Sequence, residues 1–284
     1  MKTPHTLTVP TTLGPLHVRD AGPADGPVAL LWPSLFSDGD TSWGTQLDGL
    51  HALGWRTLLI DPPGTGTSAP AARRFTMEEC GEAALRVLDD ADVDRAVFFG
   101  LSWGGFVALR VALAAPHRVR ALILSNTTAR GVGLRERLRV RMLSLLIRVG
   151  VPGGPGRLVV AAMLSDHSRR HDTGFADELA ATVNSLDRAG LARAVRSVLG
   201  DRTDVVDALH RITAPTLVIA GAEDKALPSA PHSDDLAERI VGAQLEVLPR
   251  VAHLAPCEEP TEVANLIKEF LAPLDSAPGS NFRT

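Results

Sequence analysis

The chain has 284 residues, of which 45% are hydrophobic and 22% are charged, and its formal net charge is -4. This composition excludes a disordered or fibrous protein, and the length fits one large domain or one domain with an insertion. A slightly acidic chain has no overall attraction for nucleic acid or for an anionic membrane surface. We therefore expect neither nucleic acid nor a membrane as a partner.

Two features of the sequence bear on the cellular compartment. Cys80 and Cys257 are too few for a disulfide framework, and residues 1–14 lack the apolar stretch of a signal peptide. No segment approaches the ~20 consecutive apolar residues that span a bilayer. The expectation is a soluble, cytoplasmic protein.

The first predicted element is an antiparallel hairpin, because the runs Leu7–Val9 and Leu16–Val18 flank a turn with Gly14 and Pro15. Six further aliphatic runs alternate with helical patterns, which indicates a mainly parallel sheet with helices on both faces. The fold class is therefore α/β. The six predicted strands are Val28–Trp32, Arg56–Ile60, Ala96–Gly100, Ala121–Ser125, Thr216–Ala220 and Gln244–Leu248.

Three helices are predicted around these strands. Thr76 and Glu79 match a capping box, which opens a helix that runs to about Leu88. The other two helices are Trp103–Ala114, which ends before Pro116, and Val263–Leu271 near the end of the chain.

Residues 127–212 interrupt the alternation, because they carry several helical patterns and no clear strand. We therefore predict a core of residues 1–126 and 213–272, a helical cap of residues 127–212, and a flexible tail of residues 273–284. A helix is expected from Leu134 to Val149. Leu138, Met142 and Leu145 share one stripe of it and either line the substrate pocket or pack against the core.

Residues 100–104, Gly-Leu-Ser-Trp-Gly, place a serine between a predicted strand and a predicted helix. Such a turn strains the serine backbone and needs small neighbours, which Gly100 and Gly104 supply. It would hold the Ser102 hydroxyl above the sheet, where the free N–H groups of a helix N-terminus stabilise negative charge. Ser102 is the predicted nucleophile, and a glycine-rich turn with an idle serine is the alternative.

A serine nucleophile requires a base, and the base requires an acid that orients it. Two strands downstream of Ser102 each end in a loop with a suitable side chain. Asp224, or its neighbour Glu223, follows the strand that ends at Ala220, and His253 follows the strand that ends at Leu248. We choose Asp224 as the acid. The order Ser102, Asp224, His253 is that of the α/β-hydrolases.

From about Leu13 to Leu271 the chain resembles the α/β-hydrolase family. The resemblance also includes Asp-Pro-Pro-Gly-Thr-Gly-Thr-Ser at 61–68, Gly-Ala-Glu-Asp at 221–224, His-Leu-Ala at 253–255 and Glu-Glu-Pro at 258–260. Residues 125–130 and 214–221 are most similar to 3-oxoadipate enol-lactonases and related hydrolases. The resemblance implies a cofactor-free serine hydrolase that cleaves a small ester or lactone through an acyl-enzyme.

One loop departs from the pattern of the family. Many members have His-Gly at the end of the first parallel strand, whereas this chain has Trp-Pro-Ser-Leu-Phe at 32–36. Similarity to the enol-lactonases implies that Pro33 and Ser34 replace this pair. The backbone N–H groups of Leu35 and Trp103 would then form the oxyanion hole. Phe36 is assigned to the substrate pocket.

Other functions remain open at this point. The same triad serves carbon–carbon bond hydrolases, thioesterases and perhydrolases, and a ligand-binding receptor can retain a hydrolase pocket. His167 and His171 have helical spacing but no third ligand, so no metal site is expected. Cys257 lies near His253 in the sequence but lacks a turn of its own, so we assign it to packing.

Arginines flank the apolar stripe of the helix that is expected from Leu134. Arg137 or Arg141 could bind the carboxylate that an enol-lactone carries, although a charged helix flank is usually solvated. We therefore expect a neutral, largely apolar ester or lactone as the substrate. A homo-oligomer is possible, and the sequence does not fix the oligomeric state.

Overall fold

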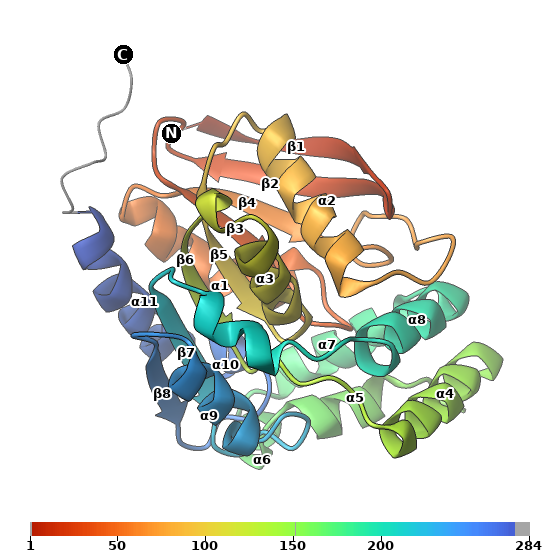
Figure 1. The fold of residues 1–284 in the computed structure, drawn as a ribbon. Coiled ribbons are helices and arrows are strands. Elements are labelled where there is room, and N and C mark those ends of the chain that lie inside the picture. Colours follow the sequence, from red (N-terminus) through yellow and green to blue (C-terminus); the bar gives the residue numbers. More distant parts are fainter. Residues whose placement is uncertain (1, 151, 276–284) are drawn as a thin grey trace.

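The computed structural model describes residues 2–150 and 152–275 of the chain (Figure 1). Its strands are β1 (Lys2–Thr11), β2 (Gly14–Gly22), β3 (Val28–Trp32), β4 (Arg56–Asp61), β5 (Ala96–Leu101), β6 (Val119–Ser125), β7 (Thr216–Gly221) and β8 (Gln244–Leu248). Within the described residues they form one eight-stranded sheet in the order β1-β2-β4-β3-β5-β6-β7-β8. β2 pairs antiparallel with β1 and β4, and the remaining pairs are parallel. The α/β prediction is confirmed.

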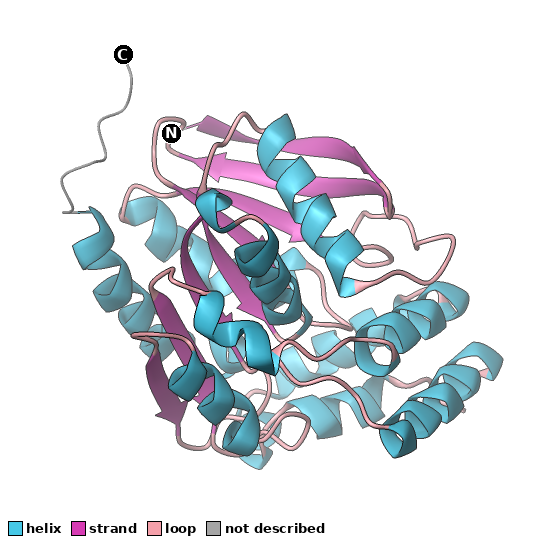
Figure 2. Ribbon diagram, viewed as in Figure 1, coloured by secondary structure: helices cyan, strands magenta, loops and turns pink. Residues whose placement is uncertain are grey.

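Helices cover both faces of this sheet (Figure 2). One face carries α1 (Gly39–Ala52) and α11 (Pro260–Asp275), and the other carries α2 (Met77–Asp90), α3 (Trp103–Ala114) and α9 (Ser229–Arg239). The short elements are η1 (Pro116–Arg118), η3 (Val206–Arg211) and α10 (Ala255–Glu258). Because helices shield both faces, the central strands β3, β5 and β7 are buried along their whole length.

The core of the protein lies between the sheet and its helices, and its largest side chains are tryptophans. Trp32, Trp43, Trp55 and Trp103 are all fully buried. The Trp43 Nε1 donates a hydrogen bond to the Trp32 carbonyl oxygen at 3.1 Å, which fixes α1 against the end of β3. Gly104 N donates to the Pro33 carbonyl oxygen at 3.2 Å, which holds the loop after β3 close to the start of α3.

The predicted strands are all present, and the predicted helices differ from the observed ones mainly at their ends. The capping box of α2 is formed, with Glu79 N donating to Thr76 Oγ1 at 3.1 Å and Thr76 N donating to Glu79 Oε2 at 2.9 Å. The last helix, α11, starts at Pro260, since proline fits the first turn of a helix, and extends to Asp275. It therefore includes the start of the predicted tail, and residues 276–284 lie outside the described residues.

Between β6 and β7 the described chain is helical and contains no strand. Its elements are α4 (Leu134–Val149), α5 (Gly156–Met163), α6 (Asp166–His171), α7 (Thr173–Ser185), α8 (Arg188–Val195) and η2 (Arg196–Gly200), followed by η3. Figure 1 shows α4 to α8 gathered on one side of the sheet. We call residues 127–212 the helical segment.

The helix α4 spans the predicted residues, but it buries a different face. Leu138, Met142 and Leu145 are 51%, 60% and 54% exposed, so the alternative that this stripe packs on the core is wrong. The buried residues of α4 are Val140, Ser144 and Ile147, which also recur at helical spacing. Ser144 Oγ donates to the Ala192 carbonyl oxygen at 2.8 Å, which fixes this face against α8. In the described part of the chain, no helix is both long and apolar enough to cross a bilayer.

Candidate active site

The turn between β5 and α3 holds Ser102 in a strained conformation. Its φ angle is 52°, in the left-handed region that residues other than glycine rarely adopt. A Cβ atom at Gly104 would lie 2.0 Å from the Trp32 carbonyl oxygen, and one at Gly100 would lie 2.4 Å from the Gly104 carbonyl oxygen. Only glycine therefore fits at either position, as the sequence pattern predicts.

Hydrogen bonds from the next strand hold this turn. Ser102 N donates to the Ser125 carbonyl oxygen at 2.9 Å, and Thr127 Oγ1 donates to the Ser102 carbonyl oxygen at 2.8 Å. A Cβ atom at Gly105 would lie 2.3 Å from Thr127 Oγ1, so a third glycine makes this contact possible. The backbone of Ser102 is thus fixed by the end of β6 as well as by its own helix.

The loops after β7 and β8 bring a carboxylate and an imidazole together. His253 Nδ1 lies 2.7 Å from Asp224 Oδ2, and both side chains are buried. Because a carboxylate only accepts hydrogen bonds, Nδ1 is the protonated nitrogen and Nε2 of the neutral ring is free to accept a proton. Glu223, the alternative acid, is exposed on the surface. The structure therefore pairs Asp224 with His253.

Asp224 accepts further hydrogen bonds at both of its carboxylate oxygens. The backbone N–H groups of Ala226 and Leu227 donate to Oδ1 at 2.9 Å each, and Asn126 Nδ2 donates to Oδ2 at 3.1 Å. Burial by itself raises the pKa of Asp224. The attraction of His253 and the donated hydrogen bonds outweigh burial and hold that pKa below its usual range.

The sequence analysis missed Asn126. This buried residue directly follows β6 and has a φ angle of 47°. Besides Asp224, its Nδ2 donates to the Ala252 carbonyl oxygen at 2.8 Å, and its Oδ1 accepts from Ser125 Oγ at 2.9 Å. Its amide thus joins the acid to the loop that carries His253. A polar residue at the carboxyl end of a buried strand is the signal that could have identified it.

Glu258 joins the loop of His253 to the helical segment. Its Oε1 accepts from the N–H groups of Ala252 and Leu254 at 3.0 and 3.2 Å. Its Oε2 accepts from Ser165 N at 2.9 Å and Ser168 Oγ at 2.8 Å. One carboxylate therefore fixes both parts of the molecule.

The loop after β3 supplies one backbone N–H group beside the serine turn, that of Leu35, and the turn itself supplies a second, that of Trp103. Ser34 N donates to Ser42 Oγ at 3.2 Å, and Phe36 has a φ angle of 74°. Within residues 2–150 and 152–275, the N–H groups of Leu35 and Trp103 donate to no other group. Both are therefore available to a bound oxygen atom.

A cavity of about 680 Å³ lies between this site and the helical segment. Ser102, His253, Leu35, Phe36 and Phe106 line it from the core. The helical segment contributes mostly apolar side chains, among them Val140, Leu143, Leu146, Ile147, Val159 and Met163. A molecule with a largely apolar body fits such a cavity.

Five of the residues considered for substrate contact do not reach this cavity. Leu138, Met142 and Leu145 are absent from its wall, so their assignment to the pocket is wrong, whereas Phe36 does line it. Arg137 and Arg141 are exposed on the outer side of α4. The charged side chains on the wall are Glu136, Arg139 and Arg202, with His232 and His253 beside them.

The remaining candidate residues lie away from the cavity. Cys257 Sγ donates to the carbonyl oxygens of Thr41 and Ser42 at 3.2 and 3.5 Å, and burial raises the pKa of its thiol. It therefore acts in packing. The rings of His167 and His171 stack 4.3 Å apart on α6. Across the described residues, no three His, Cys, Asp or Glu side chains are placed to hold a metal ion.

Comparison with known proteins places this geometry in a family. Residues 30–260 match the alpha/beta hydrolase fold family. RutD of Variovorax paradoxus, provisionally named a carbamate hydrolase, is 32% identical over 275 residues, which cover 93% of this chain and 98% of that protein. The 3-oxoadipate enol-lactonase 2 of Acinetobacter baylyi is 27% identical over 252 residues, 86% of this chain and 88% of that protein. The resemblance to enol-lactonases is thus confirmed.

A solved structure gives the same result for the fold. A thermophilic esterase from Thermogutta terrifontis superposes with a TM-score of 0.85 at 25% sequence identity. The match covers 96% of this chain and 99% of the esterase. The similarity therefore includes the helical segment as well as the sheet.

Proposed function

The chain belongs to the alpha/beta hydrolase fold family and is a hydrolase, and we propose that it cleaves carboxylic esters or lactones with Ser102 as the nucleophile. The observation that carries this proposal is the 2.7 Å contact between His253 Nδ1 and Asp224 Oδ2, next to a cavity that Ser102 and His253 both line. A strained serine, an imidazole and a buried carboxylate in this arrangement are the parts that acyl transfer needs.

In the proposed reaction, His253 Nε2 takes the proton of Ser102 Oγ while Oγ bonds to the substrate carbonyl carbon. The N–H groups of Leu35 and Trp103 donate to the oxygen that becomes negative, and Asp224 stabilises the imidazolium. When the carbon–oxygen bond of the ester breaks, His253 gives the proton to the alcohol oxygen. An acyl-enzyme on Ser102 remains.

Water completes the cycle by the same steps. His253 takes a proton from the water molecule, whose oxygen bonds to the acyl carbon. The bond to Ser102 Oγ then breaks, and Oγ regains a proton from His253. The carboxylic acid leaves, and the serine is restored. In a lactone the released alcohol and acid belong to one molecule.

In the same proposal, residues 127–212 act as a lid over the catalytic residues. Support comes from the cavity wall, which the helical segment shares with Ser102 and His253. His253 N also donates to the carbonyl oxygen of Met163, at the end of α5, at 2.9 Å. The lid would exclude water and select the substrate by the shape of its apolar wall.

Labelling with a fluorophosphonate tests the proposal directly. The unmodified protein should gain one phosphonyl group on Ser102 and hydrolyse members of a panel of esters, lactones, thioesters and carbamates. Ser102→Ala should abolish labelling and lower kcat on the order of a thousandfold or more. Ser185→Ala, which changes an exposed serine on α7, is the matched control and should do neither.

Two results would contradict the proposal. A folded Ser102→Ala variant that retains more than about a tenth of kcat would remove Ser102 from the reaction. A folded wild-type protein that neither takes the label nor hydrolyses any member of the panel would instead support a ligand-binding protein with a hydrolase pocket.

A further inference from the structure

One cation on the cavity wall lies close to the proposed nucleophile. Arg202 follows η2, is half-buried, and lines the cavity together with Ser102. The central carbon of its guanidinium lies 4.9 Å from the centre of the Phe106 ring. Phe106 is one helical turn from Ser102 on α3, and its N–H donates to the Ser102 carbonyl oxygen at 3.2 Å. Arg202 therefore lies beside the first turn of α3.

The partners of Arg202 are neutral. Its Nε donates to the Arg130 carbonyl oxygen at 3.0 Å, and its Nη1 lies 3.4 Å from the Val198 carbonyl oxygen. Among the residues that the structure describes, no carboxylate lies within 4.0 Å of its nitrogens. Burial, together with nearby Arg110, lowers the pKa of Arg202 to about 10, so the side chain is still charged at neutral pH. No carboxylate of the described residues contacts this charge, and Glu136 on the same wall attracts it only from beyond 4.0 Å.

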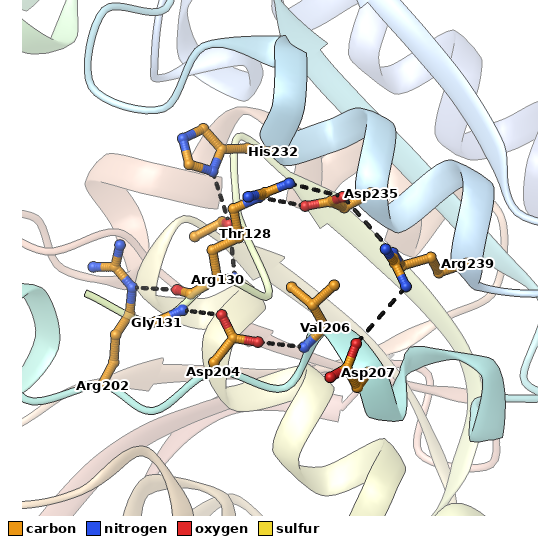
Figure 3. Close-up of polar contacts among 10 residues, drawn as sticks. All are labelled: Thr128, Arg130, Gly131, Arg202, Asp204, Val206, Asp207, His232, Asp235 and Arg239. Carbon is orange, nitrogen blue, oxygen red and sulfur yellow. Dashed lines mark hydrogen bonds and ion pairs between the residues drawn. The ribbon is translucent and has the colours of Figure 1, made fainter. Parts of the chain in front are cut away.

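The carboxylates in the neighbourhood are engaged elsewhere (Figure 3). Asp204 accepts from the N–H groups of Gly131 and Val206 at 2.8 and 2.9 Å. Asp235 Oδ1 accepts from Arg130 Nη2 at 3.1 Å. The acidic residue on the cavity wall is Glu136, whose Oε2 lies 3.4 Å from Arg139 Nη1.

Arg110 is also accounted for. Its Nε lies 3.5 Å from Glu78 Oε1, and its Nη2 lies 3.1 Å from Thr203 Oγ1. Arg110, Arg130 and Arg139 therefore each have an acidic partner in contact, whereas Arg202 has none within 4.0 Å among the described residues. A charge left unpaired in a largely apolar cavity is costly, and a bound anion would remove that cost.

His232 provides a second polar group on the same wall. Its Nδ1 lies 2.9 Å from Thr128 Oγ1, which accepts a hydrogen bond from Arg130 N at 3.0 Å. The Thr128 hydroxyl can then donate a hydrogen bond to His232 Nδ1. In that tautomer the neutral ring carries its proton on Nε2. Figure 3 shows the His232 ring and the Arg202 guanidinium on the same side of this network. Burial, Arg202 and Arg130 lower the pKa of His232, so the ring is a neutral donor.

We propose that Arg202 binds a carboxylate of the substrate and that His232 is a second donor to it. The inference rests on the proposed ester or lactone hydrolysis and names its substrate class. The substrate is an ester with a carboxylate at one end, and an apolar chain joins this carboxylate to the ester group. One helical turn, about 5.4 Å along α3, separates Phe106 beneath the guanidinium from Ser102. The carboxylate is therefore several bonds away from the carbonyl that reacts. This departs from the neutral substrate expected from the sequence.

The test compares two substrates of equal size. One is the p-nitrophenyl monoester of adipic acid, and the other is the p-nitrophenyl ester of adipic monoamide, which replaces the carboxylate by a neutral amide. The wild-type protein should have a kcat/KM at least ~10-fold higher for the acid, as expected for charge-assisted hydrogen bonds. Arg202→Gln should bring the ratio close to one, and Arg202→Lys should retain part of it.

Arg141→Gln is the matched control, because Arg141 is an exposed arginine outside the cavity, and it should leave the ratio unchanged. The inference is overturned if the wild-type protein prefers the amide or treats both esters alike. It is also overturned if Arg202→Gln keeps the wild-type ratio. The comparison of the two esters with the wild-type protein tests the inference even if a variant does not fold.

A binding measurement separates this inference from the proposed reaction. Calorimetry with monomethyl adipate and the Ser102→Ala protein should give binding that Arg202→Gln weakens at least ~10-fold. If the wild-type protein hydrolyses neither ester but this binding is present, the proposed reaction fails and the anion site stands. If both esters are hydrolysed equally and no binding depends on Arg202, the reaction stands and the anion site fails.

Discussion

Asn126 Nδ2 lies 3.1 Å from Asp224 Oδ2, the same carboxylate oxygen that lies 2.7 Å from His253 Nδ1. A single oxygen therefore accepts hydrogen bonds from both an amide and an imidazole. The second Asn126 bond, to the Ala252 carbonyl oxygen at 2.8 Å, reaches the residue that precedes His253. Asn126 thus limits how far the acid and the base can move relative to one another.

Asn126→Gly should lower kcat by about 10- to 100-fold with little change in KM, because one hydrogen bond to a charged group is lost. Glycine accepts the positive φ angle of 47°, so the backbone need not change. The amide helps to lower the pKa of Asp224, so the pKa of this carboxyl group should be higher in the variant. Steady-state kinetics measures kcat and KM, and an unchanged kcat in the folded variant would contradict this role of Asn126.

Asp224→Asn should lower kcat by about 10⁴-fold, because an amide at this position favours the wrong tautomer of His253. Glu223→Gln is the matched control and should have little effect, since Glu223 is exposed and the side chain of Asp224 is buried. Kinetics on one ester with both variants is the measurement. The acid is misassigned by one position if Glu223→Gln is the damaging change.

Gly104→Ala should destabilise the protein by about 1–3 kcal/mol or more, because the new Cβ atom would meet the Trp32 carbonyl oxygen at 2.0 Å. Gly44→Ala is the control, since a Cβ atom there would lie 3.7 Å from Asp40 Oδ1, an ordinary contact distance, and the backbone of Gly44 is helical. That change should be neutral or stabilise the protein by up to about 1 kcal/mol. Urea unfolding of both variants decides, and equal effects would contradict the packing argument.

The pH dependence of stability should reveal His232. Its folded pKa is below the unfolded value, so the unfolded chain binds more protons between the two values. Wild-type stability should therefore fall as pH drops through about 6.5 towards the folded pKa. His232→Gln removes this component, so the stability difference between the two proteins should be smaller at pH 5 than at pH 7.5. Urea unfolding at both pH values tests this, and a constant difference would contradict it.

The sequence predicted the elements that depend on local patterns. Ser102, Asp224 and His253 each follow a strand of the parallel part of the sheet, and the carboxyl ends of parallel strands meet at one edge of a sheet. Asn126 follows a strand in the same way, but its importance depends on which strands are neighbours. No local pattern marks Arg202, because its position on the cavity wall is set by how the helical segment folds back over α3.

The sequence also could not predict which face of α4 is buried. Apolar side chains occupy most positions from Met142 to Ile147, so more than one stripe has helical spacing. The stripe that is buried, Val140, Ser144 and Ile147, contains a serine that becomes satisfied only by the carbonyl oxygen of Ala192. Periodicity alone favours burial of the stripe with Leu138, Met142 and Leu145. The contact of Ser144 with α8 buries the other stripe instead.

The hydrogen bonds that Glu258 accepts hold one end of the helical segment, at α6, against the core. Raising α6 from the core would break the contacts of Ser165 and Ser168 with a carboxylate that also braces the backbone on both sides of His253. Opening at that end would break the hydrogen bonds that hold the proposed base. If the helical segment is a lid, as we propose, it should therefore open at the far end, beside α4, where His253 is not disturbed.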